Sequence, residues 1–214
     1  MGNNKFGIKK QMRIIICLTG MPGAGKSTIA SSLKEKGFPV ITMGDAVREE
    51  ANRQNLEPTD YNLGSLMLKL RRDLGPGAIA HLILRKMERD YNNINVIIID
   101  GIRSMPEVEV LKTVGYVKLL AIHASTNTRF TYTKERARPD CPSSIQDFVV
   151  RDKRELTVGI SEAIALADET LSNNDLTIDE LKEKGFEIIQ KWIAEINKND
   201  NNITIKHKGN NNNK

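Results

Sequence analysis

Residues 20–27 read Gly20-Met21-Pro22-Gly23-Ala24-Gly25-Lys26-Ser27, and Thr28 follows them. This stretch matches the phosphate-binding pattern G-x-x-x-x-G-K-[ST] in full. Its glycines let the backbone turn tightly, so that successive N–H groups point at phosphate oxygens. A strand-like run precedes the loop and a helical pattern follows it. We therefore expect all nine residues to bind a nucleoside triphosphate, with Lys26 on the terminal phosphates and Ser27 on a magnesium ion.

Short apolar runs alternate with helical patterns on both sides of this loop. The expected strands are residues 14–19, 39–42, 96–100, 117–123 and a weaker 169–172. The expected helices are residues 27–36, 45–54, 64–74, 78–90, 106–114, 126–136, 144–157 and 178–197. The strands at 39–42, 96–100 and 117–123 are nearly continuously apolar, which is typical of burial on both faces. The alternation predicts a three-layer α/β fold, with a parallel central sheet flanked by helices.

The boundaries of the fold follow from composition. We expect one domain over residues 13–197, preceded by a flexible N-terminus at 1–12. From Lys198 onward the chain is rich in Asn and Lys, and such a segment buries too little apolar area to become ordered. We therefore expect a disordered tail over residues 198–214.

Charge and apolar content limit the function classes. The net charge is +5, but the lysines and arginines are spread along the chain, which favours a site for polyanionic phosphates over a dedicated nucleic-acid surface. No apolar run approaches the roughly 20 residues of a membrane span. The run from Ile14 to Leu18 is too short for a signal peptide, so we expect a cytoplasmic protein. The two cysteines have no Cys or His nearby at the spacing of metal ligands.

A carboxylate ends the third expected strand. Val96-Ile97-Ile98-Ile99-Asp100 is an apolar run with Asp100 at its end, the usual form of the second motif of nucleoside triphosphatases. Many buried strands end in Asp at a turn for structural reasons alone. Together with the phosphate-binding loop, however, the pattern predicts that Asp100 holds the same magnesium ion as Ser27.

Three further segments carry a family resemblance. Gly44-Asp45-Ala46-Val47-Arg48 follows the second strand, Asp100-Gly101-Ile102-Arg103 follows the third, and several arginines follow the fourth. In this order they resemble the nucleoside monophosphate kinases, adenylate kinase above all, over residues 13–175. The chain is more similar still to an uncharacterised archaeal family of adenylate-kinase-related proteins, through GMPGAGKS, MGDAVREE, DGIRS and RDKRELTVGI. The resemblance implies a P-loop nucleoside triphosphatase fold of the nucleotide kinase type.

The resemblance also implies roles for individual residues. Arg48 and Arg103 would grip the phosphate of an acceptor, and Asp45 would receive or orient the acceptor's proton. Arg129, Arg136 and Arg138 would close over the transferring phosphate, because a guanidinium is a flat, permanently charged, bidentate donor; Arg151 would join them. An acceptor-side helical segment is expected near residues 45–90 and a lid near residues 126–158.

Two departures from adenylate kinase leave the acceptor open. Cys141 stands where a second acidic residue is usual, and Asp-Gly-Ile-Arg-Ser replaces Asp-Gly-Phe-Pro-Arg, which shifts the arginine by one position. Other arginines have ordinary structural interpretations. Arg71 and Arg72 are expected on a solvated helix face. Arg154 suits a surface ion pair with Glu155 or Asp152 as well as it suits a residue of the lid.

The main hypothesis is a small-molecule kinase that transfers the γ-phosphoryl group of MgATP to a nucleotide or nucleotide-like acceptor. The first alternative is a dephospho-coenzyme A kinase-like activity. Its support is a segment that resembles one near the end of dephospho-coenzyme A kinases, Ala167-Asp168-Glu169-Thr170-Leu171-Ser172-Asn173. The second is a nucleotide-dependent regulatory or RNA-associated ATPase. A plain switch does not need a cluster of arginines, which argues against the second alternative.

Overall fold

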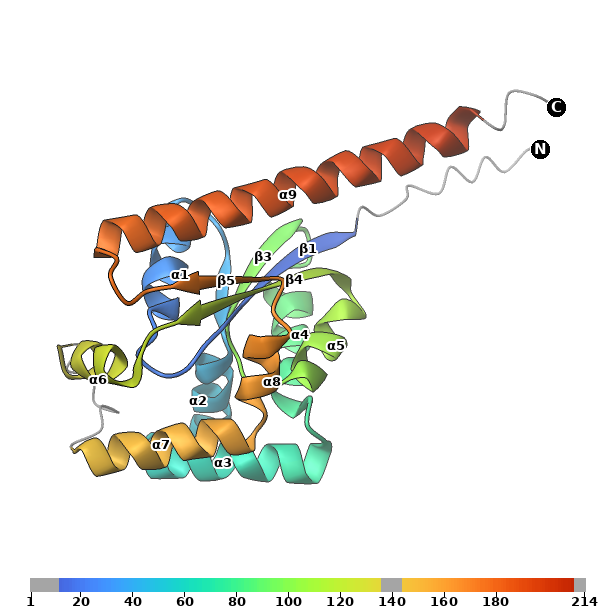
Figure 1. Cartoon of the computed structure of the whole chain (residues 1–214). Coiled ribbons are helices and arrows are strands. Elements are labelled where there is room, and N and C mark those ends of the chain that lie inside the picture. The colour runs from blue at the N-terminus through green and yellow to red at the C-terminus, as the bar shows by residue number, and fades with distance from the viewer. Residues whose placement is uncertain (1–11, 136–143, 210–214) are drawn as a thin grey trace.

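A single parallel sheet organises the protein (Figure 1). The computed structural model describes residues 12–135 and 144–209, with side chains as far as Asp200. The strands are β1 (Arg13–Thr19), β2 (Val40–Thr42), β3 (Val96–Ile102), β4 (Gly115–His123) and β5 (Glu169–Ser172). All neighbours are parallel, in the order β2-β3-β1-β4-β5. The parallel sheet is confirmed, and each predicted strand lies within two residues of the observed limits.

Helices connect the strands and cover the sheet. They are α1 (Lys26–Glu35), α2 (Met43–Arg53), α3 (Asp60–Leu74), α4 (Ala78–Asp90), α5 (Met105–Lys112), α6 (Thr126–Glu135), α7 (Ile145–Thr157), α8 (Ile160–Ala165) and α9 (Ile178–Gly209). α3 begins four residues before the predicted start, because the Thr59 hydroxyl accepts a hydrogen bond from the Asn62 N–H at 3.2 Å and caps the helix. α8 was not predicted, because six residues are too few to display a helical period.

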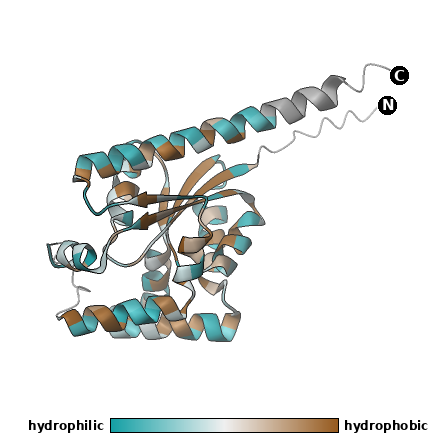
Figure 2. Cartoon of the chain, in the orientation of Figure 1, coloured by the Kyte–Doolittle hydropathy of each residue, from teal (hydrophilic) through white to brown (hydrophobic). Residues whose placement is uncertain are grey.

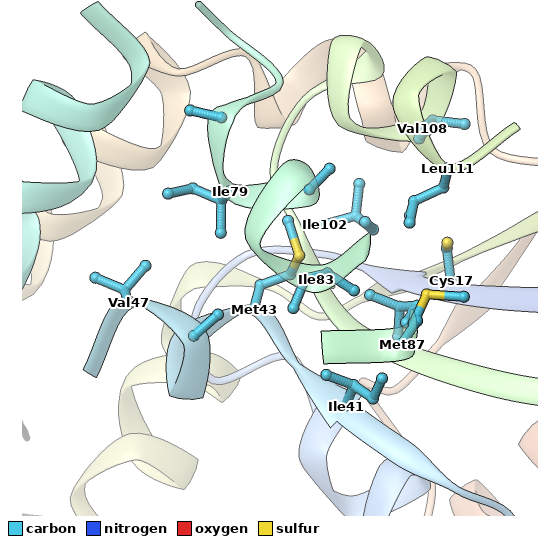
Figure 3. Close-up of a cluster of buried hydrophobic side chains, with 14 of the residues drawn as sticks. Cys17, Ile41, Met43, Val47, Ile79, Ile83, Met87, Ile102, Val108 and Leu111 are labelled. Carbon is cyan, nitrogen blue, oxygen red and sulfur yellow. The ribbon is translucent and has the colours of Figure 1, made fainter. Parts of the chain in front are cut away.

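Two hydrophobic cores lie on opposite faces of the sheet. Successive side chains of a strand point to opposite faces, so Ile15 and Cys17 of β1 join one core, whereas Ile14, Ile16 and Leu18 join the other. The first core is closed mainly by α2, α3, α4 and α5, with Ile79, Ile83 and Met87 of α4 at its centre (Figure 3). The second is closed by α1 and α9. Brown strands between helices with teal outer faces show the same three layers in Figure 2.

The C-terminal helix is longer than predicted. α9 packs against α1, and Gly185 allows the close approach: a Cβ there would lie 2.9 Å from Ile29 Cδ1. The helix then continues to Gly209 and passes beyond the strands in Figure 1. The helix therefore extends beyond its predicted end at Asn197. The predicted disorder from Lys198 onward stays a prediction. Once the first turns are fixed by packing, each added residue gains a hydrogen bond at little cost, and neither Pro nor Gly interrupts residues 186–208.

No helix within the described ranges combines the length and the apolar character that crossing a membrane would require.

Ile189 of α9 provides a test of the second core. It is fully buried against this core, so Ile189→Ala should lower the free energy of unfolding by about 2–5 kcal/mol, through lost burial and the cavity that remains. Urea denaturation followed by circular dichroism measures the change. The neighbouring Gln190 is exposed, and Gln190→Ala should stay within about 0.5 kcal/mol of the parent chain. Equal effects of the two substitutions would contradict the packing of α9 on the sheet.

Candidate nucleotide-binding and phosphate-transfer site

The phosphate-binding loop leaves the carboxyl end of β1 and leads directly into α1. Its first glycine, Gly20, has φ 139°, and a Cβ at this position would lie 2.1 Å from the carbonyl oxygen of Ile122 on β4. Its last, Gly25, has φ 109° and precedes the first residue of α1. Only glycine fits this backbone and this clearance. The loop therefore presents its N–H groups together with the N-terminus of α1, the arrangement that binds phosphate.

Side chains from distant elements hold the loop from behind. The Asn173 side-chain amide, just after β5, donates to the carbonyl oxygen of Ala24 at 3.0 Å. The guanidinium of Arg129, on α6, donates from Nη1 to the carbonyl oxygen of Pro22 at 3.0 Å. Both side chains are nearly fully buried. The shape of the loop is thus fixed by Arg129 of α6, the helix after β4, and by Asn173, the residue directly after β5.

Lys26 is folded back over the loop that contains it. Its ammonium donates to the carbonyl oxygens of Gly20 at 2.6 Å and Met21 at 3.1 Å. Withdrawal from water lowers the pKa of Lys26 to about 8, and the charge of Arg103 lowers it further, whereas that of Asp100 opposes the shift. A bound phosphate would favour the charged form again. Lys26 therefore loses its positive charge as pH rises through about 8.

Ser27 and Asp100 are the two residues predicted to hold magnesium. Asp100 lies on β3, paired with Leu18 of β1 and Thr42 of β2, and is 7% exposed. Both residues line the same cavity. The Ser27 Oγ is buried and has no hydrogen-bond partner within the described ranges. A hydroxyl and a carboxylate are oxygen donors of the kind that Mg²⁺ prefers. The pair therefore fits a magnesium ion.

The cavity beside the loop, here called the phosphate cavity, extends from the loop to α2 and α7. It is lined by Gly20, Pro22, Gly23, Gly25, Lys26, Ser27, Thr42, Gly44, Arg48, Asp100, Gly101, Ile102, Arg103, Thr133, Arg151, Glu155 and Ile160. A second space, here called the α3–α7 hollow, adjoins it and is lined by Gly44, Val47, Arg48, Asp60, Leu63, Gly64, Met67, Arg103, Arg151, Arg154 and Glu155. The two spaces share Arg48, Arg103 and Arg151, so three arginines face both.

Arg48 and Asp45 lie on the first turns of α2. The Arg48 guanidinium bonds the Asp45 carboxylate through Nη2 at 2.5 Å, and both side chains are about half exposed. Asp45 lines a third hollow together with Arg48, Ser27 and Asp100. The sequence predicted both residues at an acceptor site, and the structure places both close to the predicted magnesium ligands.

Arg103 is held in place at two points. Its Nε donates to Glu155 Oε2 at 2.5 Å, and its backbone N–H donates to Glu107 Oε2 at 2.8 Å. The charge of Glu155 raises the pKa of Arg103. Burial alone would raise the pKa of Glu155, but the charge and hydrogen bond of Arg103 hold it below its usual range. The pair is therefore fully ionised at the wall of the phosphate cavity.

Glu107 extends these contacts to α3. It is completely buried, and its Oε1 accepts from Arg71 Nη2 at 2.5 Å, with the Arg71 side chain only 8% exposed. The predicted solvated position was therefore wrong for Arg71, because a buried carboxylate requires a cation. The same prediction was correct for Arg72, because its side chain is 75% exposed. Arg71 acts on the site indirectly, by fixing the carboxylate that fixes Arg103.

α7 is attached to its surroundings mainly through charges. Its buried residues are Phe148 and Glu155. Asp152 forms two hydrogen bonds with Arg129 of α6, at 2.9 and 2.5 Å, and Arg154 forms two with Asp60 of α3, at 3.0 and 2.8 Å. Arg154 therefore pairs with neither Glu155 nor Asp152. In Figure 1, α7 and α3 lie beside each other below the sheet.

The arginines predicted to close over the phosphate have different positions. Arg129 is 4% exposed and points into the protein, between Pro22, Asp152 and the ring of Phe148 at 5.0 Å. It is absent from the described lining of the phosphate cavity. Arg136 and Arg138 lie outside the described residues, as does Cys141. Arg151 lines the cavity, as the resemblance implies.

Two acidic residues at the site were missed by sequence reasoning. Glu155 lies four residues after Arg151, a spacing typical of an exposed helical ion pair, and no local pattern marks it as buried. Asp60 follows Thr59 in the first turn of α3, where an acidic residue is common for reasons of helix stability. Neither position carries a signal of its partner, because Arg103 and Arg154 are far away along the chain.

The fold and the loop together define a class: this is a P-loop nucleoside triphosphatase fold of the nucleotide kinase type. A sequence model of the AAA domain family matches residues 19–148. The chain belongs to the UPF0200 family. It is 42% identical over 165 residues to the UPF0200 protein of Pyrococcus abyssi, covering 76% of this chain and 88% of the relative. It is 41% identical over 160 residues to that of Methanocaldococcus jannaschii, covering 75% and 81%.

Solved structures agree with this class of fold. TT1252 from Thermus thermophilus superposes with a TM-score of 0.60 at 17% identity, covering 84% of this chain and 98% of that one. Shikimate kinase from Acinetobacter baumannii, in complex with shikimate, gives a TM-score of 0.51 at 14% identity, covering 86% and 94%. At such identities the likeness concerns the fold alone. The archaeal relatives confirm the family predicted from the motifs.

The pKa of Lys26 generates a prediction for nucleotide binding. Only the ammonium form pairs with phosphate, and the pKa is lowered to about 8. Affinity for a nucleoside triphosphate should therefore be nearly constant below pH 7 and fall as pH rises through 8. The dissociation constant should increase about tenfold between pH 7 and pH 9, measured by titration with a fluorescent nucleotide. Lys26→Arg, which keeps its charge over this range, should bind with a flat pH profile. A flat profile in the parent chain would contradict the lowered pKa of Lys26.

Proposed function

We propose that this protein is a small-molecule kinase that transfers the γ-phosphoryl group of MgATP to a nucleotide or nucleotide-like acceptor. The observation that carries the proposal is the combination of a complete phosphate-binding loop with three arginines that line the same cavity. Those arginines are Arg48, Arg103 and Arg151. A protein that only binds a nucleotide needs the loop but not a second, arginine-lined space beside it.

The donor half would use residues close to the loop. Backbone N–H groups of Gly20 to Ser27 would bind the phosphates, and Lys26 would leave the two loop carbonyls to pair with the terminal phosphates. Magnesium, held by Ser27 and Asp100, would neutralise charge that develops on the phosphate oxygens. Asn173 and Arg129 would keep the loop in shape from behind.

The acceptor half would use α2, the segment after β3, and α7. Arg48, Arg103 and Arg151 would orient the acceptor and stabilise the charge spread over the transferring phosphoryl group. Asp45 would receive or orient the acceptor's proton. α3 belongs to the predicted acceptor-side segment and α7 to the predicted lid, and the Asp60–Arg154 pair joins them. Keeping these helices together over the site would exclude water and suppress hydrolysis.

The kinase hypothesis predicts a specific loss with Lys26→Ala. Without the ammonium, the loop loses its cation for the terminal phosphates, and phosphoryl transfer should fall by at least about a hundredfold, judged by the effect of losing one preorganised donor. The melting temperature should remain within a few degrees. Lys69→Ala on α3 is a matched control, since Lys69 is exposed and lies outside the cavities described above. Transfer at the parental rate by Lys26→Ala would refute the mechanism.

An acceptor screen tests the reaction itself. ATP labelled in the γ-phosphate, with magnesium, is incubated with nucleoside monophosphates and dephospho-coenzyme A, and with no acceptor. We expect a labelled product that depends on one acceptor. Label that appears only as free phosphate, at a rate no acceptor changes, would instead favour a regulatory ATPase.

A further inference from the structure

An acidic side chain stands inside the cavity that is built for phosphates. Glu155 of α7 lines both the phosphate cavity and the α3–α7 hollow, and it is only 2% exposed. Its Oε2 accepts the hydrogen bond from Arg103 at 2.5 Å. A second anion on that guanidinium has to displace this carboxylate or lie beside it. For an acceptor phosphate that would use Arg103, Glu155 is therefore a competitor.

Arg103 has little freedom to turn toward a ligand. Its backbone N–H is bonded to Glu107, which is itself fixed by Arg71 of α3. Its side chain is bonded to Glu155, whose pKa is held below the usual range, so that the carboxylate stays ionised near neutral pH. An ionised carboxylate only accepts hydrogen bonds. The group that meets Arg103 and Glu155 from the cavity side should thus carry a proton to donate.

The other basic residues of the acceptor half are arranged in the same way. Arg48 is paired with Asp45, and Arg154 is paired with Asp60 by two hydrogen bonds. The Nε of Arg151 lies 3.9 Å from the same Asp60 carboxylate. Each of these guanidinium groups therefore has a carboxylate partner within the protein. A phosphate dianion would meet a negatively charged carboxylate beside every one of them, and this repulsion would disfavour its binding. A hydroxyl group would find hydrogen-bond acceptors.

On the basis of the kinase activity proposed above, we propose that Glu155 makes this site selective for an acceptor that presents a hydroxyl group, not a phosphate group, to Arg103 and the P-loop. A lone pair of the hydroxyl oxygen forms the new bond to the γ-phosphorus. The bond between that phosphorus and the β–γ bridging oxygen breaks, and its electrons remain on the departing ADP. The hydroxyl proton passes to a carboxylate of the site and then to water. Asp45, which lines the neighbouring hollow with Arg48, Ser27 and Asp100, is the carboxylate assigned to this step in the proposed function.

The first test compares acceptor classes with the unmodified protein. Labelled ATP and magnesium are offered with hydroxyl acceptors (adenosine, dephospho-coenzyme A and shikimate) and with the four common nucleoside monophosphates as phosphate acceptors, and the position of the label is read by chromatography and phosphorus NMR. We expect label on a hydroxyl oxygen, at a rate at least tenfold above any label on a phosphate oxygen. Preferential formation of nucleoside diphosphates would overturn the role of Glu155 while leaving the kinase function intact.

The second test removes the charge of Glu155. With the P-loop saturated by MgADP, Glu155→Gln should bind AMP at least tenfold more tightly than the parent chain, measured by calorimetry. Glu155→Asp, which keeps the charge, should bind AMP as weakly as the parent. Glu162→Gln removes an exposed carboxylate on α8 and should change nothing. Equal AMP affinity in Glu155→Gln and the parent chain would overturn the proposal even if no acceptor is labelled.

Failure of the two proposals can be told apart. Absence of labelled product with every acceptor, together with steady release of free phosphate, would count against the kinase. It would leave the AMP-binding comparison as the decisive result for Glu155. Thermal melting checks that each variant folds. If Glu155→Gln does not fold, the acceptor comparison with the unmodified protein decides the proposal alone.

Discussion

β1 is hydrogen-bonded along both edges, to β3 on one side and β4 on the other, and the remaining parts of the site depend on that central position. Leu18 lies opposite Asp100 on β3 and Leu120 on β4, and the Thr19 hydroxyl donates to the carbonyl oxygen of Ile102 at 2.9 Å. The chain first extends the sheet on the β3 side and then returns to the β4 side. The loop after β1 therefore opens into the crevice where the strand order switches, the usual ligand position in such sheets.

The second layer of organisation is electrostatic and centres on α7. Its carboxylates and guanidinium groups pair in three directions, with Arg129 of α6, Arg103 after β3 and Asp60 of α3. The pairs of Arg129 and Arg103 are largely buried, whereas Asp60 is 43% exposed. Buried pairs contribute little net stability, because desolvation offsets their attraction, but removing one partner leaves an unpaired charge. They fix the position of α7 more than they stabilise the fold. Two of the three pairs border the phosphate cavity or the α3–α7 hollow.

The sequence was informative where the pattern is local. The glycines, Lys26 and Ser27 were predictable because one continuous stretch forms the loop, and Asp100 because an apolar strand ends in it. Pairings between residues that are distant along the chain are not marked by any local sequence pattern. Arg71 and Arg72 are adjacent on α3, yet one is buried against Glu107 while the other is exposed. The burial of Glu155 and the pairing of Asp60 with Arg154 depend on how distant segments pack together, and no local pattern in α7 or α3 marks either feature.

The arginines show why residue type alone does not assign a role. Arg129 and Arg103 both seemed suited to phosphate by resemblance, but Arg129 uses its donors on Asp152 and on the Pro22 carbonyl of the loop. It shapes the phosphate site from outside the described lining. Arg103 reaches the cavity already bonded to a carboxylate. The guanidinium groups of the proposed acceptor half thus differ from free phosphate-binding groups, because Asp45, Asp60 and Glu155 are paired with Arg48, Arg154 and Arg103.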